Sequence, residues 1–421
     1  MPAAQPIRAS RGVRDILPEQ WNGPWRHVSG SAAATAGRFG YLPIETPIIE
    51  PAELVERGIG DSTDIVTKEM FRFQDRGERW LVLRPEGTAG TVRAYFEGNL
   101  NQGPQPARLY TIGPMFRAER PQAGRYRQFY QFNVEAIGDP SPALDAEVIE
   151  IATGWLAGLG LAGVTLELNS VGDGKCRPAY REALLAYYRP LRDQLCPDCQ
   201  ARLEVNPLRL LDCKEDRRFV AGAPKITDYL CDECAAAFAE VRRLLDAAGV
   251  EYRVNPLIVR GLDYYTRTAF ELHHQAIGGA QNALGGGGRY DGLAEELGWP
   301  PTPGVGFAAG IDRVVGMLGE EAIDVVAPPA ADVAIVPDGD QPDAAAAVGR
   351  ICRSARSTWI DYSSRSLRAK MRSVNRLGAR WAAIFNAEEA ARRVVQLRDL
   401  NSGAQAEVAW DALPAALAGV E

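Results

Sequence analysis

The 421-residue sequence lacks any long apolar run. No stretch of about 18 consecutive apolar residues occurs, so we expect no membrane-spanning helix and no membrane partner. Residues 1–12 contain no apolar core segment, which argues against a secretory signal peptide. Seven cysteines, an odd number, in a long chain without such a signal indicate reduced thiols and a cytoplasmic location.

The chain also lacks an excess of basic residues. Its 47 Lys and Arg against 54 Asp and Glu give a net charge of −7. That charge provides no overall attraction to nucleic acid or to an anionic membrane, so any such contact must come from local patches. With 46% hydrophobic residues the chain can form a sizeable core, and its length allows two or three domains of about 100–200 residues each.

Residues 108–138 predict two β-strands joined by a charged loop. Leu109–Phe116 is rich in aromatic and β-branched residues, and Gln128–Ile137 alternates with a period of two. The alternation puts Gln131, together with Asn133 and Glu135, on one face of a strand that otherwise looks buried. Buried polar groups need partners, which either the protein or a ligand must supply.

The loop between these strands, residues 117–127, carries four arginines and one glutamate. A guanidinium offers a planar fork of donors, so this composition suits phosphates. A hairpin with a solvated basic loop is the alternative.

Two more stretches place charged side chains at the ends of predicted elements. At residues 84–88 a strand ends and a helix begins, with Thr88 as its expected N-cap, so Glu86 lies where ligand contacts are common. Arg260 begins a loop that leads into a strand with two tyrosines at its mouth. Taken singly, Glu86 could be a capping carboxylate and Arg260 a structural partner of Asp263.

Together these stretches resemble the motifs of class II aminoacyl-tRNA synthetases, and among them those of histidyl-tRNA synthetases. The resemblance covers nearly the whole chain in order. It is carried by RGVRDILP at 11–18, YLPIETPIIE at 41–50, RPEGT at 84–88, FRAE at 116–119, GRYRQF at 124–129, RGLDYYTRTAFE at 260–271 and GVGFAAGIDR at 304–313. Asp312 stands where relatives usually have Glu, which keeps the charge and shortens the reach.

The resemblance implies an α+β catalytic core on a mostly antiparallel sheet, spanning residues 1–325, with a helical insertion at about 175–250. Residues 326–331 form a linker. The alternating strands and helices of residues 332–421 form a C-terminal α/β anticodon-binding domain. A homodimer joined partly through an edge strand at Tyr41–Glu50 is also implied; a short strand covered by its own chain is the alternative.

The activity implied is that of a histidine–tRNA ligase. It converts L-histidine and ATP, with Mg²⁺, to histidyl-adenylate and transfers the histidyl group to the 3′ end of tRNA(His). The implied catalytic residues are Arg117 and Arg260. Those for histidine are Glu86, Gly87, Thr88, Gln131, Glu135, Tyr264 and Tyr265, and those for ATP are Arg117, Glu119, Arg125, Arg260 and Arg313.

Residues 350–380 contain nine basic residues and one acid, a local basic patch in a chain of net negative charge. A solvated charged helix is the alternative. The candidates for tRNA contact are Arg120, Gln122, Arg365, Arg368, Lys370 and Arg372.

Two Cys-x-x-Cys pairs lie within the insertion, Cys196 with Cys199 and Cys231 with Cys234. Four thiolates can form a tetrahedral zinc site, so we predict one structural zinc held by both pairs. The pairs are separated by more than the common spacing of about 15–20 residues, and buried free thiols are the alternative.

Two non-ligase functions stay open on the sequence alone. A histidine-sensing regulatory subunit of ATP phosphoribosyltransferase has the same core, but it typically lacks the tail domain and parts of the catalytic motifs. A tRNA-binding regulator with an inactive site is the other. The tail and the arginines at 117, 260 and 313 favour the ligase.

Overall fold

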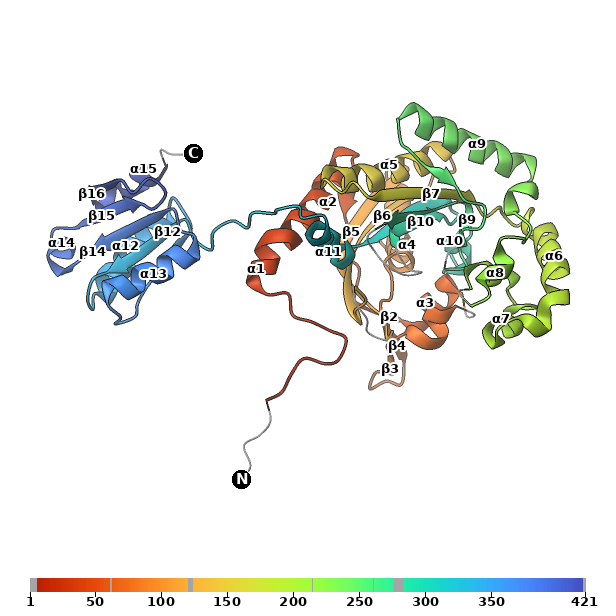
Figure 1. Ribbon diagram of the computed structural model, residues 1–421, viewed down its shortest axis with the longest axis horizontal. Helices are drawn as coiled ribbons and strands as arrows, with labels where there is room; N and C mark the ends of the chain where they lie inside the picture. The colour runs from red at the N-terminus through yellow and green to blue at the C-terminus, as the bar shows by residue number, and fades with distance from the viewer. Residues whose placement is uncertain are drawn as a thin grey trace, which may run out of the picture. The chain divides into compact units, whose positions relative to one another are not determined.

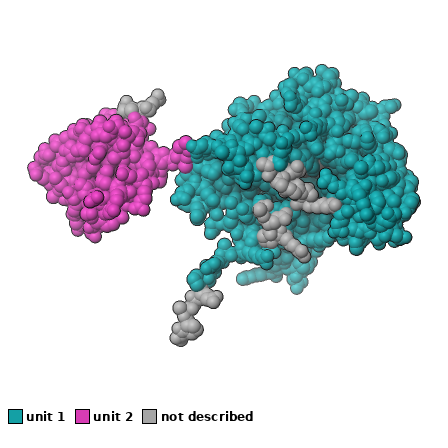
Figure 2. All heavy atoms as spheres, in the orientation of Figure 1, with its two compact units in different colours: residues 1–325 teal, residues 326–421 magenta. Residues whose placement is uncertain are grey.

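The computed structural model describes residues 6–60, 63–119, 124–213, 215–259, 261–275 and 283–418. The chain divides into unit 1, Met1–Val325, and unit 2, Val326–Glu421 (Figure 2). Each unit has an apolar core of its own. None of the helices in the described ranges is long and apolar enough to cross a membrane.

Within the described residues of unit 1, the largest sheet has eight strands in the order β1-β5-β6-β11-β10-β9-β7-β8 (Figure 1). Neighbours pair antiparallel except β1 with β5 and β7 with β8, so the predicted mostly antiparallel core is confirmed. The strands are β1 (Leu42–Pro43), β5 (Ala107–Phe116), β6 (Gln128–Ile137), β7 (Val164–Ser170), β8 (Arg253–Val254), β9 (Thr266–His274), β10 (Ala283–Arg289) and β11 (Gly304–Gly310).

One face of this sheet is covered by four helices whose apolar residues form the main core. They are α2 (Arg26–Arg38), α5 (Pro142–Gly158), α9 (Asp232–Ala247) and α11 (Ile311–Glu320). Helix α5 begins where Ser141 accepts a hydrogen bond from the Ala143 N–H, with Pro142 in the first turn. Its Trp155 is fully buried against Phe132 of β6.

The opposite face carries the polar residues of β6, because alternate side chains of a strand point to opposite sides. Phe132, Val134 and Ala136 belong to the main core. A second apolar cluster includes α4 (Thr88–Glu97) and α10 (Leu293–Glu296) together with three tyrosines, Tyr264, Tyr265 and Tyr290.

The sequence predicts one edge strand at Tyr41–Glu50. The structure instead has two short strands in this region, and they belong to two different sheets. Strand β1 pairs in parallel with β5, whereas β2 (Ile49–Pro51) pairs with β4 (Trp80–Leu83), which also pairs with β3 (Arg72–Gln74). Pro43 and Pro47 lack the N–H that a continuous ladder would need.

The insertion is helical in the structure as the sequence predicts. Its helices are α6 (Arg177–Tyr188), α7 (Pro197–Arg202), α8 (Arg217–Val220) and the start of α9. Helices α6, α7 and α8 share a small apolar core that includes Tyr180, Leu184 and Leu210, whereas the buried apolar residues of α9 belong to the main core. In the described part of unit 1 there are two further α-helices, α1 (Pro18–Gln20) and α3 (Ala52–Ile59).

In unit 2 the described residues form a five-stranded sheet of order β13-β12-β14-β15-β16, parallel at β13, β12 and β14 and antiparallel beyond. Its elements are β12 (Val333–Pro337), α12 (Pro342–Arg353), β13 (Thr358–Ile360), α13 (Leu367–Leu377), β14 (Trp381–Phe385), α14 (Ala387–Ala391), β15 (Val394–Asp399), β16 (Gln405–Ala409) and α15 (Leu413–Ala418). The predicted α/β tail is thus confirmed, with β16 as an additional strand.

Candidate active site

A cavity of about 320 Å³ opens on the polar face of the main sheet of unit 1. That volume lies in the range of small-molecule sites. The strands β6, β10 and β11 contribute to its lining. Its charged and aromatic lining residues are Glu86, Arg117, Glu119, Arg125, Tyr126, Phe129, Tyr264, Tyr265, Glu271, Tyr290, Phe307, Asp312 and Arg313.

Glu86 closes the N-terminus of α4 at one side of the cavity. Its two carboxylate oxygens accept hydrogen bonds from the backbone N–H groups of Thr88 and Ala89, each at 2.8 Å. Glu86 thus satisfies donors that the first helical turn leaves unpaired. The sequence assigned the N-cap to Thr88, but Thr88 is the first residue of the helix and Gly87 precedes it.

Thr88 turns its side chain toward β6 instead. Its hydroxyl donates a 2.7 Å hydrogen bond to one oxygen of Glu135, and the hydroxyl of Tyr290 donates a 2.5 Å bond to the other. Glu135 is 2% exposed, and its burial raises its pKa to about 8. The two hydrogen bonds act in the opposite direction and lower the pKa, but the effect of burial is larger. The structure therefore places Glu135 behind the cavity wall, where it holds Thr88 and Tyr290.

The strand that pairs with β6 beside Glu135 needs a glycine at one position. Gly306 of β11 pairs with Glu135 in the sheet register, and a Cβ at Gly306 would lie 1.9 Å from a Glu135 oxygen. The glycine run at 285–288 is part of β10 between β9 and β11. A Cβ at Gly287 would meet the Gly306 carbonyl oxygen at 2.0 Å, so these glycines let the strands approach.

Three tyrosines form the aromatic wall. The rings of Tyr264 and Tyr265 are 4.6 Å apart, and Tyr290 meets Tyr264 edge to face at 5.9 Å. The Tyr264 hydroxyl lies 3.5 Å from Glu86. Sequence reasoning missed Tyr290. The feature that could have identified Tyr290 is its position directly after the glycine-rich strand β10, because an aromatic residue with a hydroxyl group at a strand end can contact a ligand.

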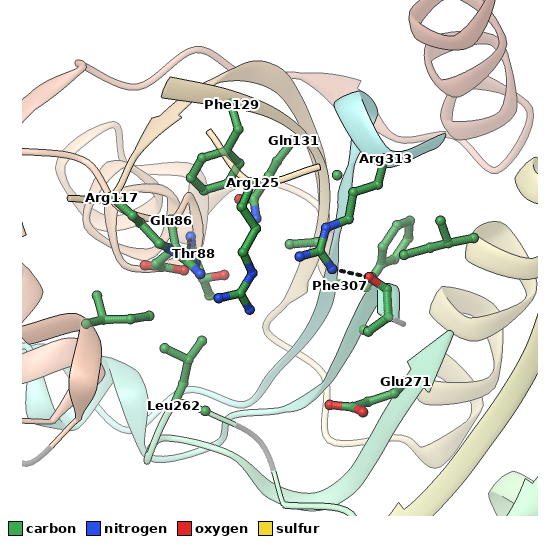
Figure 3. Close-up of a pocket in the computed structure, with 18 of the residues that line it drawn as sticks. Glu86, Thr88, Arg117, Arg125, Phe129, Gln131, Leu262, Glu271, Phe307 and Arg313 are labelled. Atoms are coloured by element: carbon green, nitrogen blue, oxygen red, sulfur yellow. Dashed lines mark hydrogen bonds between the residues drawn. The ribbon is translucent and has the colours of Figure 1, made fainter. Parts of the chain in front are cut away.

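Three arginines from separate elements point into the same space (Figure 3). Arg117 follows β5 and donates through Nε to the Pro85 carbonyl at 3.0 Å. Arg125 pairs with Glu119 at 2.6 Å. Arg313, in the first turn of α11, donates to the Ala283 carbonyl oxygen.

The three cations are held close enough to disfavour one another. Burial lowers the pKa of Arg313, and the charges of Arg125 and Arg117 lower it further, while Glu119 acts in the opposite direction. The described lining of the cavity carries three arginines and four carboxylates in all. The three guanidinium groups lie close to one another, with Glu119 as the carboxylate paired to Arg125, and this part of the cavity is positive. Such a site is matched by a ligand with several negative charges.

Gln131 adds an unsatisfied polar atom to the cavity lining. Its side-chain oxygen is buried and finds no hydrogen-bond partner among the described residues. A buried acceptor without a donor is costly, and a ligand N–H would supply one. The Asp312 carboxylate, by contrast, already has hydrogen-bond donors, because Arg14 donates to it at 2.9 Å and the Tyr130 N–H at 2.8 Å.

The structure brings together Glu86, Thr88, Gln131, Tyr264 and Tyr265 with the three arginines and Glu119 at this cavity. Arg260, Arg120 and Gln122 lie outside the described residues.

In unit 2, the basic side chains of α13 and of the segment just before it divide between surface and core. Arg365, Arg368 and Arg372 are exposed, and Arg365 also pairs with buried Asp361 at 3.0 Å. Lys370 is 1% exposed and donates through Nζ to the Pro337 carbonyl oxygen at 2.7 Å. A buried lysine cannot reach a phosphate, so Lys370 is removed from the predicted tRNA contacts.

The two Cys-x-x-Cys pairs of the insertion do not come together. Cys196 and Cys199 group with Cys213 and Asp216, whereas Cys231 and Cys234 group with Cys176 and Asp173. The predicted single site of four cysteines is therefore wrong.

Comparison with known families gives two matches that together span most of the chain. The histidyl-tRNA synthetase family model matches residues 12–172 and 208–314, and an anticodon-binding domain model matches residues 332–419.

Among curated proteins, the histidine–tRNA ligase of Bacillus cytotoxicus is 47% identical over 411 residues, covering 96% of this chain and 97% of its own. The crystal structure of apo S. aureus histidyl-tRNA synthetase matches with a TM-score of 0.82 at 37% identity, over 98% of this chain and all of that one. A Bacillus halodurans structure described as an ATP phosphoribosyltransferase regulatory subunit/histidyl-tRNA synthetase shares the fold, with a TM-score of 0.65 at 22% identity over 91% of this chain.

Proposed function

Because the chain belongs to the histidyl-tRNA synthetase family, we propose that it is a histidine–tRNA ligase, which activates L-histidine with ATP and transfers it to the 3′ end of tRNA(His). The observation that carries the proposal is the convergence of Arg117, Arg125 and Arg313 on one cavity, beside a wall of tyrosines and Glu86. The cations suit a triphosphate, and the wall suits a small amino acid.

In the first step the histidine carboxylate attacks the α-phosphorus of ATP, a new P–O bond forms, and the bond to pyrophosphate breaks. The carboxylate is ionised at pH 7, so no general base is needed. The site must align the reactants and stabilise developing negative charge. We assign Arg117 and Arg260 to the α-phosphate. Glu119, Arg125 and Arg313 complete the ATP site, with Arg313 at the terminal phosphates.

For histidine, we assign Glu86, Thr88 and Gln131 to the ammonium group, with Gly87 linking the first two. A carboxylate, a hydroxyl and an unpaired amide oxygen together offer acceptors for its three N–H bonds. Tyr264 and Tyr265 form the imidazole side. Glu135 contributes to this recognition by holding Thr88 and Tyr290 in place.

Mg²⁺ with ATP fits the donor set. Glu119 and Glu271 are carboxylates on the cavity lining, and Mg²⁺ is usually held by one or two carboxylates plus substrate phosphates. When bound, the ion would neutralise phosphate charge.

In the second step a ribose hydroxyl of the tRNA 3′ end attacks the adenylate carbonyl and AMP leaves. We propose that the exposed arginines Arg365, Arg368 and Arg372 contact the tRNA, together with Arg120 and Gln122. Exposed side chains on a basic helix suit phosphate contacts.

We also propose a homodimer in the cytoplasm. Apolar side chains are exposed on the strands of the 41–50 segment and the small sheet beside it. Leu42 is 66% exposed, Ile49 50% and Trp80 48%. Exposed apolar groups of this size in neighbouring elements favour burial against another copy.

The regulatory-subunit alternative shares the fold, so the fold does not decide between the two functions. A histidine sensor does not need three arginines on the lining of one cavity. The deciding experiment is histidine-dependent ATP–pyrophosphate exchange on the purified chain. The ligase predicts exchange with histidine and background rates with other amino acids. Histidine binding without exchange would support the sensor instead.

A further inference from the structure

The insertion contains two clusters of chemically identical composition. The neck cluster consists of Asp173, Cys176, Cys231 and Cys234, and the inner cluster of Cys196, Cys199, Cys213 and Asp216. In each, three thiols and one carboxylate place their ligand atoms within 4.8 Å of one another. Six of the seven cysteines of the chain are thus gathered in two places, and the seventh, Cys352, is buried in unit 2.

The two clusters are built on the same plan. Each has a Cys-x-x-Cys pair whose first cysteine directly precedes a helix, Cys196 before α7 and Cys231 before α9. Each adds a second pair at the same spacing, Asp173 with Cys176 or Cys213 with Asp216. Backbone amides already point at sulfur, because the Cys199 N–H lies 3.4 Å from Cys196 Sγ and the Cys231 N–H 3.1 Å from Cys176 Sγ. Such N–H groups can donate hydrogen bonds to a metal-bound thiolate.

The sulfur separation fits ligands around one ion. Cys196 Sγ and Cys213 Sγ are 3.7 Å apart. Two sulfurs at about 2.3 Å from a tetrahedral zinc lie about 3.8 Å apart, whereas a disulfide needs about 2.05 Å. All six sulfurs are unbridged. Asp216 is 4% exposed, lies beside fully buried Cys199 and accepts a hydrogen bond from the Cys196 N–H at 2.9 Å, so its carboxylate is held among the thiols of the inner cluster.

We propose that each cluster binds one zinc ion through three thiolates and one aspartate oxygen, so that the chain holds two structural metal sites. Binding releases the three thiol protons of each site to solvent, and no electron transfer is involved. Both sites have four protein ligands, which is the closed arrangement of structural zinc.

The two sites would stabilise different parts of the insertion. The neck site joins residues 173–176, where the chain leaves β7 for the insertion, to residues 231–234, where it returns through α9. Arg177, next to Cys176, donates to the backbone carbonyls of Val171 and Tyr265, so the neck site is coupled to the aromatic wall of the cavity. The inner site fastens the start of α7 to the segment before α8. From α7, Arg202 pairs with Asp64 at 3.0 Å.

The test is metal content of the full chain, expressed with zinc and purified without chelator. We expect about two zinc ions per chain by elemental analysis. The Cys196→Ser/Cys199→Ser and Cys231→Ser/Cys234→Ser variants should each retain about one, and the matched control Cys352→Ser about two. Loss of all zinc from both double variants would mean one shared site. Wild-type protein with one zinc or none would likewise overturn the proposal.

A second measurement does not depend on the variants folding. Cobalt titrated into chelator-treated wild-type chain should saturate at about two equivalents with the absorption of tetrahedral cobalt–thiolate. In the zinc-loaded protein, alkylation followed by mass spectrometry should find the six insertion cysteines protected, and all six should react after chelation. Saturation at one equivalent, or alkylation of one cluster regardless of zinc, would contradict the two-site assignment.

Discussion

Arg313 in the cavity of unit 1 and Arg368 on α13 of unit 2 differ in what surrounds the same guanidinium group. Arg313 is partly buried, is bonded to the Ala283 carbonyl and lies near two other arginines. Arg368 is exposed on a helix surface. A fixed charge in a cavity needs no reorganisation when a substrate acquires charge, whereas an exposed charge is screened by salt. The first arrangement suits chemistry, and the second suits binding to a polyanion.

Arg289 extends the comparison to an arginine that is buried and purely structural. It is 1% exposed, forms an ion pair with buried Asp145 and donates to the Ser141 carbonyl at 3.0 Å. Arg289→Ala should lower the free energy of unfolding by about 3–5 kcal/mol, because Asp145 would be left as an unpaired buried charge. Urea denaturation measures the loss. The Arg289→Met/Asp145→Leu double variant should recover much of it, and failure to do so would show that the pair is not the cause.

The Arg313→Ala substitution should slow histidyl-adenylate formation while leaving the fold intact. We expect the rate of histidyl-adenylate formation to fall by about 10²–10³, or about 3–4 kcal/mol in activation free energy, with a much smaller change in histidine affinity. Single-turnover adenylation and calorimetry measure the two quantities. The control is Arg57→Ala, a surface arginine of α3 that pairs with exposed Glu53. Adenylation at the wild-type rate would remove Arg313 from the site.

Glu135 offers the same contrast for a carboxylate, since burial raises its pKa from an ordinary value near 4.5 to about 8. The folded state then binds more protons than the unfolded state in this pH window. Its contribution to stability is complete below pH about 4.5 and is lost as the pH rises to about 8. The Tm of Glu135→Gln should therefore fall less between pH 5 and pH 8 than that of the wild type. Parallel curves would show that Glu135 is not buried in this way.

The smallest effect is expected on α13. The Arg368→Ala/Arg372→Ala variant should reduce the slope of log affinity for tRNA against log salt by about two units, with pyrophosphate exchange unchanged. Arg392→Ala/Arg398→Ala, exposed arginines elsewhere in unit 2, is the matched control. Equal slopes in the two variants would mean that α13 has no special contact with tRNA.

Local patterns were sufficient for elements whose periodicity and burial agree. The range Gln128–Ile137 is the same in sequence and structure, because apolar and polar residues alternate without a break from Tyr130 to Ala136. Lys370 shows how a charge count misleads. It lies three residues after Leu367 and four before Val374, on the face of α13 that packs on the sheet, so helical spacing held the signal that charge alone obscured.

Contacts between distant segments were not accessible from sequence. Tyr290 and Glu135 are 155 positions apart, and only the pairing of β6, β11 and β10 brings them together. The prediction of one zinc site shared by the two cysteine pairs was wrong for the same reason. Spacing gave each Cys-x-x-Cys correctly, but the partners of each pair, Cys213 with Asp216 and Cys176 with Asp173, are chosen by how the helices of the insertion fold.

The most direct test of the division between the two units is to remove residues 326–421 and measure both half-reactions. Unit 1 has its own core and every described residue of the cavity, so histidine-dependent pyrophosphate exchange should be largely retained. Charging of tRNA(His) should fall strongly in the same preparation, with light scattering to check that its oligomeric state is unchanged. Unaltered catalytic efficiency of tRNA charging by the truncated chain would contradict the account.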